Sequence, residues 1–269
     1  MDEFGAHRPS GVNRLILFLV RMGFGRGKLK RVFSRAWQAS SPDTPVDFAY
    51  HGLRLRLRPV GNTIESKILF SSRLREAEEL AFIRQYLTGG GGCFVDIGAN
   101  VGYYALMAAH AGATQVLAAE PNPELVDRFA ANITLNGHDQ QITILPVAIG
   151  AADDTARLHL KQGDTGGSSI VRNVAADGAI DVPVRPLAAL LAEHGVTAVD
   201  AMKIDIEGME DRALAPFLIP ENSALFPRLL IIETVNRDDW EVDVLQRLAE
   251  CGYVTIAETR GNSVLALPA

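Results

Sequence analysis

The sequence predicts an α/β fold with a mostly parallel sheet that a terminal antiparallel hairpin closes. From residue 93 onward, short apolar runs alternate with segments of helical periodicity, the pattern of a sheet covered on both faces. The stretch VDIGANVG at 95–102 leads from an apolar strand through small residues into a helix. The last two strand-like runs, 253–258 and 263–267, are separated only by a turn containing Gly261 and Asn262, so we expect them to pair antiparallel.

The N-terminal segment differs from the rest in its charge. Residues 4–37 contain eight Lys or Arg and no Asp or Glu, interleaved with apolar side chains. The apolar run 15–20 is interrupted by Arg21, so it is neither a signal peptide nor a membrane span. Two interpretations stay open: an amphipathic segment on an anionic membrane surface, or a solvated helix that packs one face on the rest of the chain or on a partner subunit.

The chain divides into three regions. We expect residues 1–40 to form this basic amphipathic extension and residues 41–92 to form a cap of strand and helix, after a linker rich in Ser and Pro at 40–45. Within the cap, residues 48–58 alternate like a half-buried strand with a hairpin-like edge, and 65–87 carry apolar residues at helical spacing. The main domain spans 93–269.

Strands and helices are expected to alternate along the main domain. The expected strands lie at 93–97, 115–119, 142–149, 198–206 and 229–235, and the expected helices at 103–111, 123–135, 187–194, 209–218 and 240–251. Residues 151–186 form an irregular insertion, rich in Gly, Ser and Asp, with short alternating pieces at 156–160 and 180–184. An insertion at this place is expected to build a wall of the substrate site.

Composition limits the class of protein. With 269 residues and 48% hydrophobic residues the chain can bury a large core, while a net charge of -6 and a pI near 5.5 argue against a nucleic-acid partner. Cys93 and Cys251 are too few for a disulfide framework or a cysteine zinc site. We therefore expect a cytoplasmic protein, with any membrane contact peripheral, at the inner face, through residues 4–37.

The site is expected beyond the carboxyl ends of the strands, where open α/β sheets bind ligands. Gly98 and Gly102 let the backbone turn sharply and approach a ligand, and the helix that follows directs unpaired N–H groups to the same place. Asp96 at the strand end disfavours a pyrophosphate. Its carboxylate suits a ligand with positive charge, such as the ammonium and sulfonium groups of S-adenosylmethionine (SAM).

Glu120 ends the second strand, 24 residues after Asp96. An acid at about this spacing accepts hydrogen bonds from both ribose hydroxyls in dinucleotide-binding folds, and we favour that role. The alternative is an acid at a helix start, because Pro123 and Glu124 open the next helix.

Three charged residues, Lys203, Asp205 and Glu207, alternate along the end of an otherwise apolar strand and so point to one side of it. Buried charges need partners, so the three form either an ion-pair network or a functional site, and their place at the strand end favours the site. By position, Asp205 or Glu207 is the expected general base. Whether a divalent metal bridges carboxylate and substrate stays open, and no metal ligand is assigned.

His159 in the insertion is a further candidate base. Together with polar residues of the loop 163–170, it is expected to line an acceptor pocket. Those residues are Asp164, Ser168 and Ser169.

With these residues in place, the chain resembles the FkbM family of SAM-dependent methyltransferases over roughly residues 52–267. The likeness rests on VDIGANVGYY at 95–104, EPNP at 120–123, KIDIEGME at 203–210 and IIE at 231–233. It implies a class I methyltransferase (Rossmann-like) fold of seven strands with the last antiparallel. One departure is that family members often carry an acid after the Leu that follows the insertion, where this chain has Leu187, Ala188 and Ala189.

The resemblance also implies a reaction: methyl transfer from SAM to a hydroxyl of a sugar, a glycan or a secondary metabolite, so the expected partner is a small-molecule or glycan acceptor. Asp205, Glu207 and His159 are the candidate catalytic residues. The candidate cofactor-binding residues are Asp96, Gly98, Asn100, Gly102, Glu120, Asn122 and Ala148.

Two alternative functions belong to other classes. A nicotinamide-dependent oxidoreductase would need glycines two and five positions after Gly98, where Asn100 and Tyr103 stand. A SAM-binding scaffold without turnover, tethered through the basic N-terminus, stays an alternative that only an assay of methyl transfer separates from the enzyme.

Overall fold

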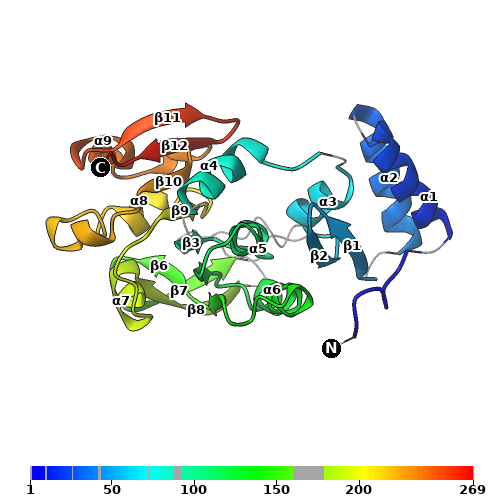
Figure 1. The fold of residues 1–269 in the computed structure, drawn as a ribbon, viewed down its shortest axis with the longest axis horizontal. Coiled ribbons are helices and arrows are strands. Elements are labelled where there is room, and N and C mark those ends of the chain that lie inside the picture. Colours follow the sequence, from blue (N-terminus) through cyan, green and yellow to red (C-terminus); the bar gives the residue numbers. More distant parts are fainter. Residues whose placement is uncertain are drawn as a thin grey trace.

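A computed structural model describes residues 2–9, 11–25, 27–41, 44–71, 73–87, 92–159 and 179–268. Among these residues, seven strands form one sheet in the order β11-β12-β10-β9-β3-β4-β5, and β12 runs antiparallel to both of its neighbours (Figure 1). The predicted fold class, including the C-terminal hairpin, is therefore confirmed. The strands are β3 (Cys93–Ile97), β4 (Gln115–Ala119), β5 (Ile142–Leu145), β9 (Ala201–Ile204), β10 (Leu229–Glu233), β11 (Val254–Glu258) and β12 (Asn262–Ala266).

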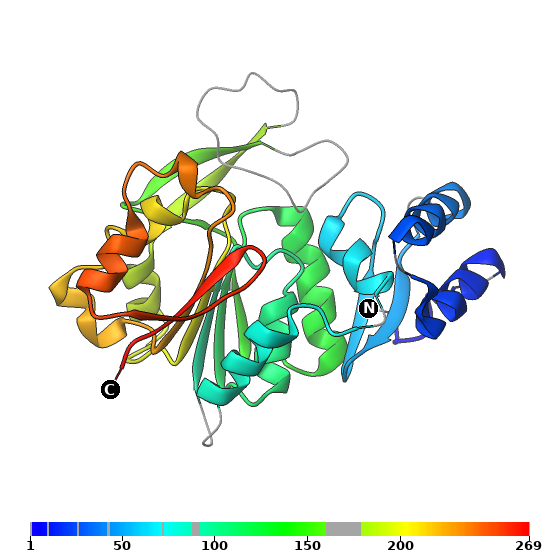
Figure 2. The same cartoon turned by 90° about the horizontal axis from the view of Figure 1, so that it is seen from above.

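Helices cover both faces of this sheet (Figure 2). Alternate residues of each strand enter different cores: Phe94 packs with the helices of one face and Val95 with those of the other. The central strands β3, β4, β9 and β10 are buried on both faces and almost continuously apolar, as the sequence indicated. One face carries α4 (Ala77–Leu87), α5 (Tyr103–His110) and α6 (Pro123–Asn136), and the other carries α7 (Leu187–Glu193), α8 (Glu210–Leu214) and α9 (Val244–Glu250). Single 3-10 turns, η3 (Pro220–Leu225) and η4 (Arg237–Asp239), flank β10.

The basic extension is helical. It consists of α1 (Gly11–Leu19), continued by the π-turn η1 (Val20–Phe24), and α2 (Gly27–Ser40). The two helices lie side by side at the end of the molecule away from the sheet, beyond the hairpin of β1 (Val46–Tyr50) and β2 (Leu53–Leu57) (Figures 1 and 2). No helix within the described ranges is both long and apolar enough to cross a membrane.

The predicted helix at 65–87 is wrong as a single element. The chain forms α3 (Thr63–Leu69) and α4, with an irregular connection between them. Phe70 buries its ring edge-on against Trp37, with ring centroids 5.9 Å apart. The hydroxyl of Tyr50 donates to the carbonyl of Arg73 and accepts from the amide of Arg75, both at 2.9 Å. Tertiary contacts thus satisfy the backbone that a continuous helix would have paired internally.

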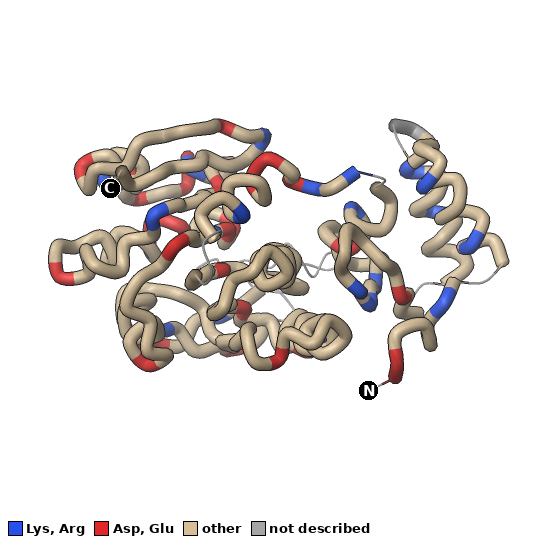
Figure 3. The backbone as a smooth tube through the Cα atoms, in the orientation of Figure 1, with Lys and Arg blue, Asp and Glu red and all other residues tan. Residues whose placement is uncertain are grey.

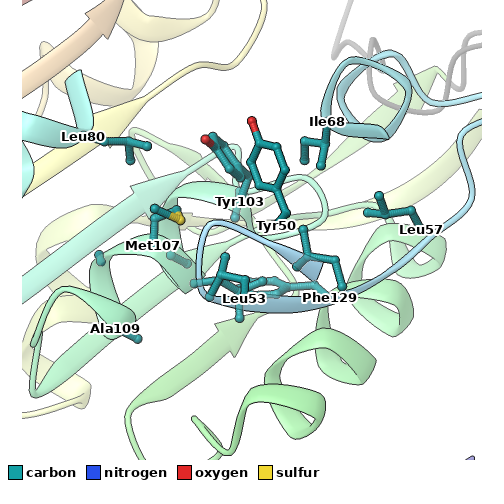
Figure 4. Packing of buried hydrophobic residues seen from close by; sticks show 14 of the residues in the cluster. Tyr50, Leu53, Leu57, Ile68, Leu80, Tyr103, Met107, Ala109 and Phe129 are labelled. Carbon is teal, nitrogen blue, oxygen red and sulfur yellow. The ribbon is translucent and has the colours of Figure 1, made fainter. Parts of the chain in front are cut away.

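The hairpin β1–β2 is joined to the main domain through α6. Along the outer edge of β2, the amide of Arg54 donates to Asn136 and that of Arg56 donates to Asn132, at 2.9 and 2.7 Å. Side chains of a helix therefore pair strand donors that would otherwise be exposed at an edge. Beneath the hairpin, Tyr50 and Tyr103 lie beside each other with Phe129 in the same core (Figure 4).

The predicted strand at 142–149 is also wrong as one element. The amide of Val147 donates to the carbonyl of Leu145 at 2.8 Å and bends the chain at Pro146, which has no N–H for a ladder. The next strand, β6 (Ala148–Gly150), pairs in a second sheet with β8 (Ala179–Pro186), which also pairs with β7 (Asp154–His159). The insertion therefore supplies ordered strands beside the main sheet. The loop residues Asp164, Ser168 and Ser169 lie outside the described residues.

We expect Gly102→Ala to destabilise the fold by about 3 kcal/mol or more. The backbone of Gly102 is left-handed, which strains any other residue, and the core around it has no room for a methyl group. Gly102 has φ of +79°, and a Cβ would lie 1.9 Å from the ring of Phe129. Gly137→Ala is the matched control: its φ is +69° with nothing within 4 Å of a Cβ, so strain alone costs about 1 kcal/mol. Urea unfolding measures both; equal losses would contradict the packing argument.

Candidate active site

A cavity of about 230 Å³ opens at the carboxyl ends of the central strands. Its wall combines strand ends of the main sheet, the start of α3 from the cap, and β6 and β7 of the second sheet. Among the predicted cofactor-binding residues it is lined by Gly98, Asn100, Glu120 and Ala148. This cavity lies at the rim of the parallel sheet, the position that the sequence predicted for the site.

The turn from β3 to α5 is packed tightly on its neighbours. The amides of Gly98 and Ala99 both donate to the carbonyl of Ala119, each at 3.0 Å. Gly98 has φ of +81°, and a Cβ there would lie 2.0 Å from the carbonyl oxygen of Asp205. Only glycine allows this close approach, which holds the turn against the ends of both flanking strands.

Asp96 does not line the cavity, although the sequence predicted a contact with the cofactor. Its buried carboxylate accepts a hydrogen bond from the amide of Ala105 at 3.0 Å, and Lys203 stands beside it in register on β9. Burial raises the pKa of Asp96 to about 7, and the Lys203 ammonium opposes that rise. Asp96 therefore lies on the α5 face of the sheet and holds the first turn of α5.

Gly102 is likewise a packing residue in this structure. It is absent from the cavity wall, and its lack of a side chain lets α5 approach the ring of Phe129. The close approach at Gly102 is therefore between α5 and α6.

Glu120 lines the cavity, and both of its oxygens are held by backbone amides. Oε2 accepts from Asn100 and Oε1 from Asn122, each at 2.8 Å, and burial raises its pKa to about 7. The helix cap is Asn122, whose Oδ1 accepts from the amide of Glu124 at 3.0 Å. Asn122, which does not line the cavity, therefore caps the helix, so Glu120 is not needed at the helix start. The carboxylate of Glu120 keeps unused lone pairs toward the cavity.

Acidic side chains from two strand ends form the opposite side of the cavity: Asp205, Glu207 and Glu233. The buried ammonium of Lys203 donates to Asp205 at 3.0 Å. Burial acts to raise the pKa of Asp205, but the Lys203 charge outweighs it and holds that pKa below its usual range. Burial, together with the charges of Asp205 and Glu207, raises the pKa of Glu233 to about 8.

Glu207 is exposed and adopts a left-handed backbone, with φ of +56°. A non-glycine residue in this region is strained, and such strain concentrates at functional sites. The buried Glu210 holds the loop in place: its Oε1 accepts from the amides of Ile206 and Gly208, at 2.8 and 3.3 Å. Trp240 donates to its other oxygen at 2.9 Å. Sequence reasoning missed this supporting acid, and its position directly after Gly208 and Met209 was the available signal.

The cap contributes cations to the wall. Arg75 and Lys67 line the cavity beside the start of α3, and the charge of Arg75 helps to lower the pKa of Asp205. Arg75 lies in the connection between α3 and α4 and forms an ion pair with Glu76. No sequence pattern pointed to Arg75, because the predicted continuous helix placed it on an ordinary helical surface.

His159 does not line the cavity, whereas its neighbour Leu158 does. Successive residues of a strand point to opposite sides, which separates the two along β7. The role predicted for His159 stays a prediction. Within the described ranges, no group of three or more His, Cys, Asp or Glu is placed to hold a metal ion.

The cavity fits the chemistry of SAM. Glu120 supplies a carboxylate for a pair of hydroxyls, and apolar side chains such as Leu125 and Ile149 adjoin it to cover a flat ring. The acids Asp205 and Glu233, at the other strand ends, give this part of the wall a negative charge that suits a sulfonium.

The chain is similar to a family model, to a curated protein and to solved structures. A family model described as methyltransferase FkbM domain matches residues 96–255, more than half of the chain. A protein of Methylorubrum extorquens named "Putative (5-formylfuran-3-yl)methyl phosphate synthase" is 36% identical over 99 residues, which are 36% of this chain and 38% of that protein.

Solved structures are also similar. The crystal structure of methyltransferase FkbM from Methylobacillus flagellatus KT matches 96% of this chain and 59% of its own, at 15% identity and a TM-score of 0.47. An O-methyltransferase from Bacillus cereus in complex with SAH matches 72% of this chain and 80% of its own, at 10% identity and a TM-score of 0.41. The chain spans less than two thirds of the M. extorquens and M. flagellatus proteins.

We expect stability to fall as pH rises from 5 to 8, and to fall less in Glu120→Gln. The pKa of Glu120 is raised in the folded protein to about 7, so between its unfolded and folded pKa values the folded state binds more protons and a rise in pH favours unfolding. Glu120→Gln should reduce the loss of unfolding free energy between pH 5 and 8 by an amount on the order of 3 kcal/mol. Urea unfolding at both pH values measures it, with Glu221→Gln on an exposed turn as control. An unchanged slope would refute the raised pKa.

Proposed function

The chain belongs to the FkbM methyltransferase family, and from that premise we propose that it is a SAM-dependent O-methyltransferase that acts on a hydroxyl of a sugar, a glycan or a secondary metabolite. The observation that carries the proposal is the cavity at the strand ends, which has Glu120 at one side and Asp205, Glu207 and Glu233 at the other. One carboxylate is then available for the ribose hydroxyls, and the separate acidic group is proposed to receive the proton of the acceptor hydroxyl.

When bound, SAM supplies a methyl group that its sulfonium already activates. The task of the chain is then to align the acceptor oxygen, to exclude water and to take up a proton. Gly98 lets the turn after β3 pack against the carbonyl of Asp205, and Glu120, fixed by the amides of Asn100 and Asn122, orients the ligand. Because backbone donors hold Glu120, its position does not depend on a flexible partner.

Asp205 and Glu233 are proposed to manage the acceptor proton. Lys203 keeps Asp205 ionised, so Asp205 can accept a hydrogen bond from the acceptor hydroxyl at neutral pH. The neighbouring Glu233, with a pKa of about 8, is matched to take up the proton near the working pH. The two acids titrate as a pair, so these pKa values describe the pair rather than separate residues. Glu207, at the exposed mouth of the cavity, is proposed to position the acceptor.

The finer localisation is also a proposal. Cys93 is buried and Cys251 half-buried, and both are free thiols, which suits a reducing cytoplasm. The proposed partner is a small-molecule or glycan acceptor, bound on the side of the cavity that the cap lines with Arg75 and Lys67.

Calorimetry with S-adenosylhomocysteine tests the cofactor site. Glu120→Ala should weaken binding by about 10-fold to 100-fold, since a charge-assisted pair of hydrogen bonds is lost. Glu207→Gln should leave binding nearly intact while turnover falls. Full turnover of Glu207→Gln on a true acceptor would remove Glu207 from the mechanism.

The pH profile tests the proton acceptor. We expect kcat/KM to rise with pH up to about 8, as the Asp205–Glu233 pair loses its proton, because only the ionised pair can accept another. In Glu233→Gln that rise should disappear while binding of S-adenosylhomocysteine is kept. A profile that is identical in the wild type and Glu233→Gln contradicts this assignment.

Transfer of a labelled methyl group from SAM to a panel of sugar, glycan and phenolic acceptors separates the enzyme from an inert SAM-binding scaffold. We expect transfer to at least one hydroxyl acceptor and none to its deoxy analogue. Tight binding of S-adenosylhomocysteine with no transfer to any acceptor favours the scaffold instead.

A further inference from the structure

The exposed apolar side chains of this protein are concentrated in the N-terminal extension. Eleven large apolar residues are exposed in the part of the chain that the structure describes, and seven of these fall within positions 12–32. Single exposed apolar residues are ordinary, but a cluster of this density marks a contact surface. The seven are Val12, Leu15, Phe18, Met22, Phe24, Leu29 and Val32.

Helix α1 carries two separate apolar sides. Ile16 and Leu17 are buried in the core of the protein. Val12, Leu15 and Phe18 recur at every third position along another side and are 51 to 59% exposed. The core therefore accounts for only one side of the helix and leaves the second uncovered.

Helix α2 repeats this arrangement. Trp37 is buried in the core, while Leu29 and Val32 are 47% and 56% exposed. Arg31 and Arg35 are exposed on the same helix, as Arg14 is on α1. Basic residues mark both helices, which lie side by side at one end of the molecule (Figure 3).

Charge decides which partner fits. Residues 4–37 hold eight of the 26 Lys and Arg and none of the 32 Asp and Glu of a chain whose net charge is -6. A second copy docked symmetrically through the same surface would bring the exposed Arg14, Arg31 and Arg35 of one copy toward those of the other, which is unfavourable. An anionic lipid surface complements both the exposed apolar stripe and the basic residues that flank it.

We propose that α1, η1 and α2 form a docking surface for an anionic lipid bilayer. The helices lie in the interfacial plane, with Leu15 and Phe18 among the acyl chains and Arg14, Arg31 and Arg35 at the lipid phosphates. The buried side of each helix remains on the core, so docking requires no unfolding of the extension. The proposal stands on the surface of the extension and holds whether or not the proposed O-methylation does.

The test is co-sedimentation of the full chain with vesicles of phosphatidylcholine alone or mixed with phosphatidylglycerol. We expect binding to the mixed vesicles that weakens as salt is added, and little binding to phosphatidylcholine. The double variant Leu15→Asp, Phe18→Asp should weaken binding at least about 10-fold. The triple variant Arg14→Gln, Arg31→Gln, Arg35→Gln should weaken it on the order of 100-fold.

The matched control is Val254→Asp with Ile256→Asp on β11, where the two side chains are 51% and 43% exposed but lie outside the basic extension. This control should bind mixed vesicles like the wild type, and urea unfolding verifies that every variant is folded. Equal binding to both vesicle types, or equal loss in the control, overturns the proposal. A lipid-free dimer that Leu15→Asp, Phe18→Asp dissociates also overturns it, since the surface would then join copies of the chain.

Discussion

The buried ammonium of Lys203 is the interaction on which the site depends. It donates to Asp205 at 3.0 Å, stands in register beside Asp96 and lies 5.5 Å from the centre of the Tyr104 ring. A buried cation without partners would be prohibitively unfavourable, and so would the buried carboxylate of Asp96 without a cation nearby. One lysine thus serves two acids: the buried Asp96 and the half-buried Asp205 at the cavity wall.

The acids at the rim of the sheet fall into two groups: some hold the backbone by hydrogen bonds, and others face the cavity. Asp96 accepts a hydrogen bond from an amide in the first turn of α5, and Glu210 accepts two from the loop that contains Glu207. Glu120, Asp205 and Glu233 face the cavity. The strained backbone of Glu207 persists because the hydrogen bonds of Glu210 on either side of it determine the loop conformation.

The cap completes the cavity from a distant part of the sequence. Asn132 and Asn136 of α6 accept hydrogen bonds from the amides at the open edge of β2. Arg128 of α6 forms an ion pair with the buried Glu65 of α3 at 2.7 Å. These contacts join the cap to the main domain, so that the start of α3 and Arg75 reach the cavity wall. The second sheet forms another part of the wall through Ala148 and Leu158.

The sequence by itself determined the sheet, its closing hairpin and the rim position of Gly98, Asn100, Glu120, Asp205 and Glu207, because periodicity and turn residues are local properties of the chain. Only the tertiary structure decided what depends on neighbours far along the chain. It divided residues 65–87 and 142–149, since side-chain contacts and a proline bend overrode continuous apolar patterns. It also turned Asp96 toward α5 and brought Arg75 to the site, because the direction of a side chain is set by the packing around it.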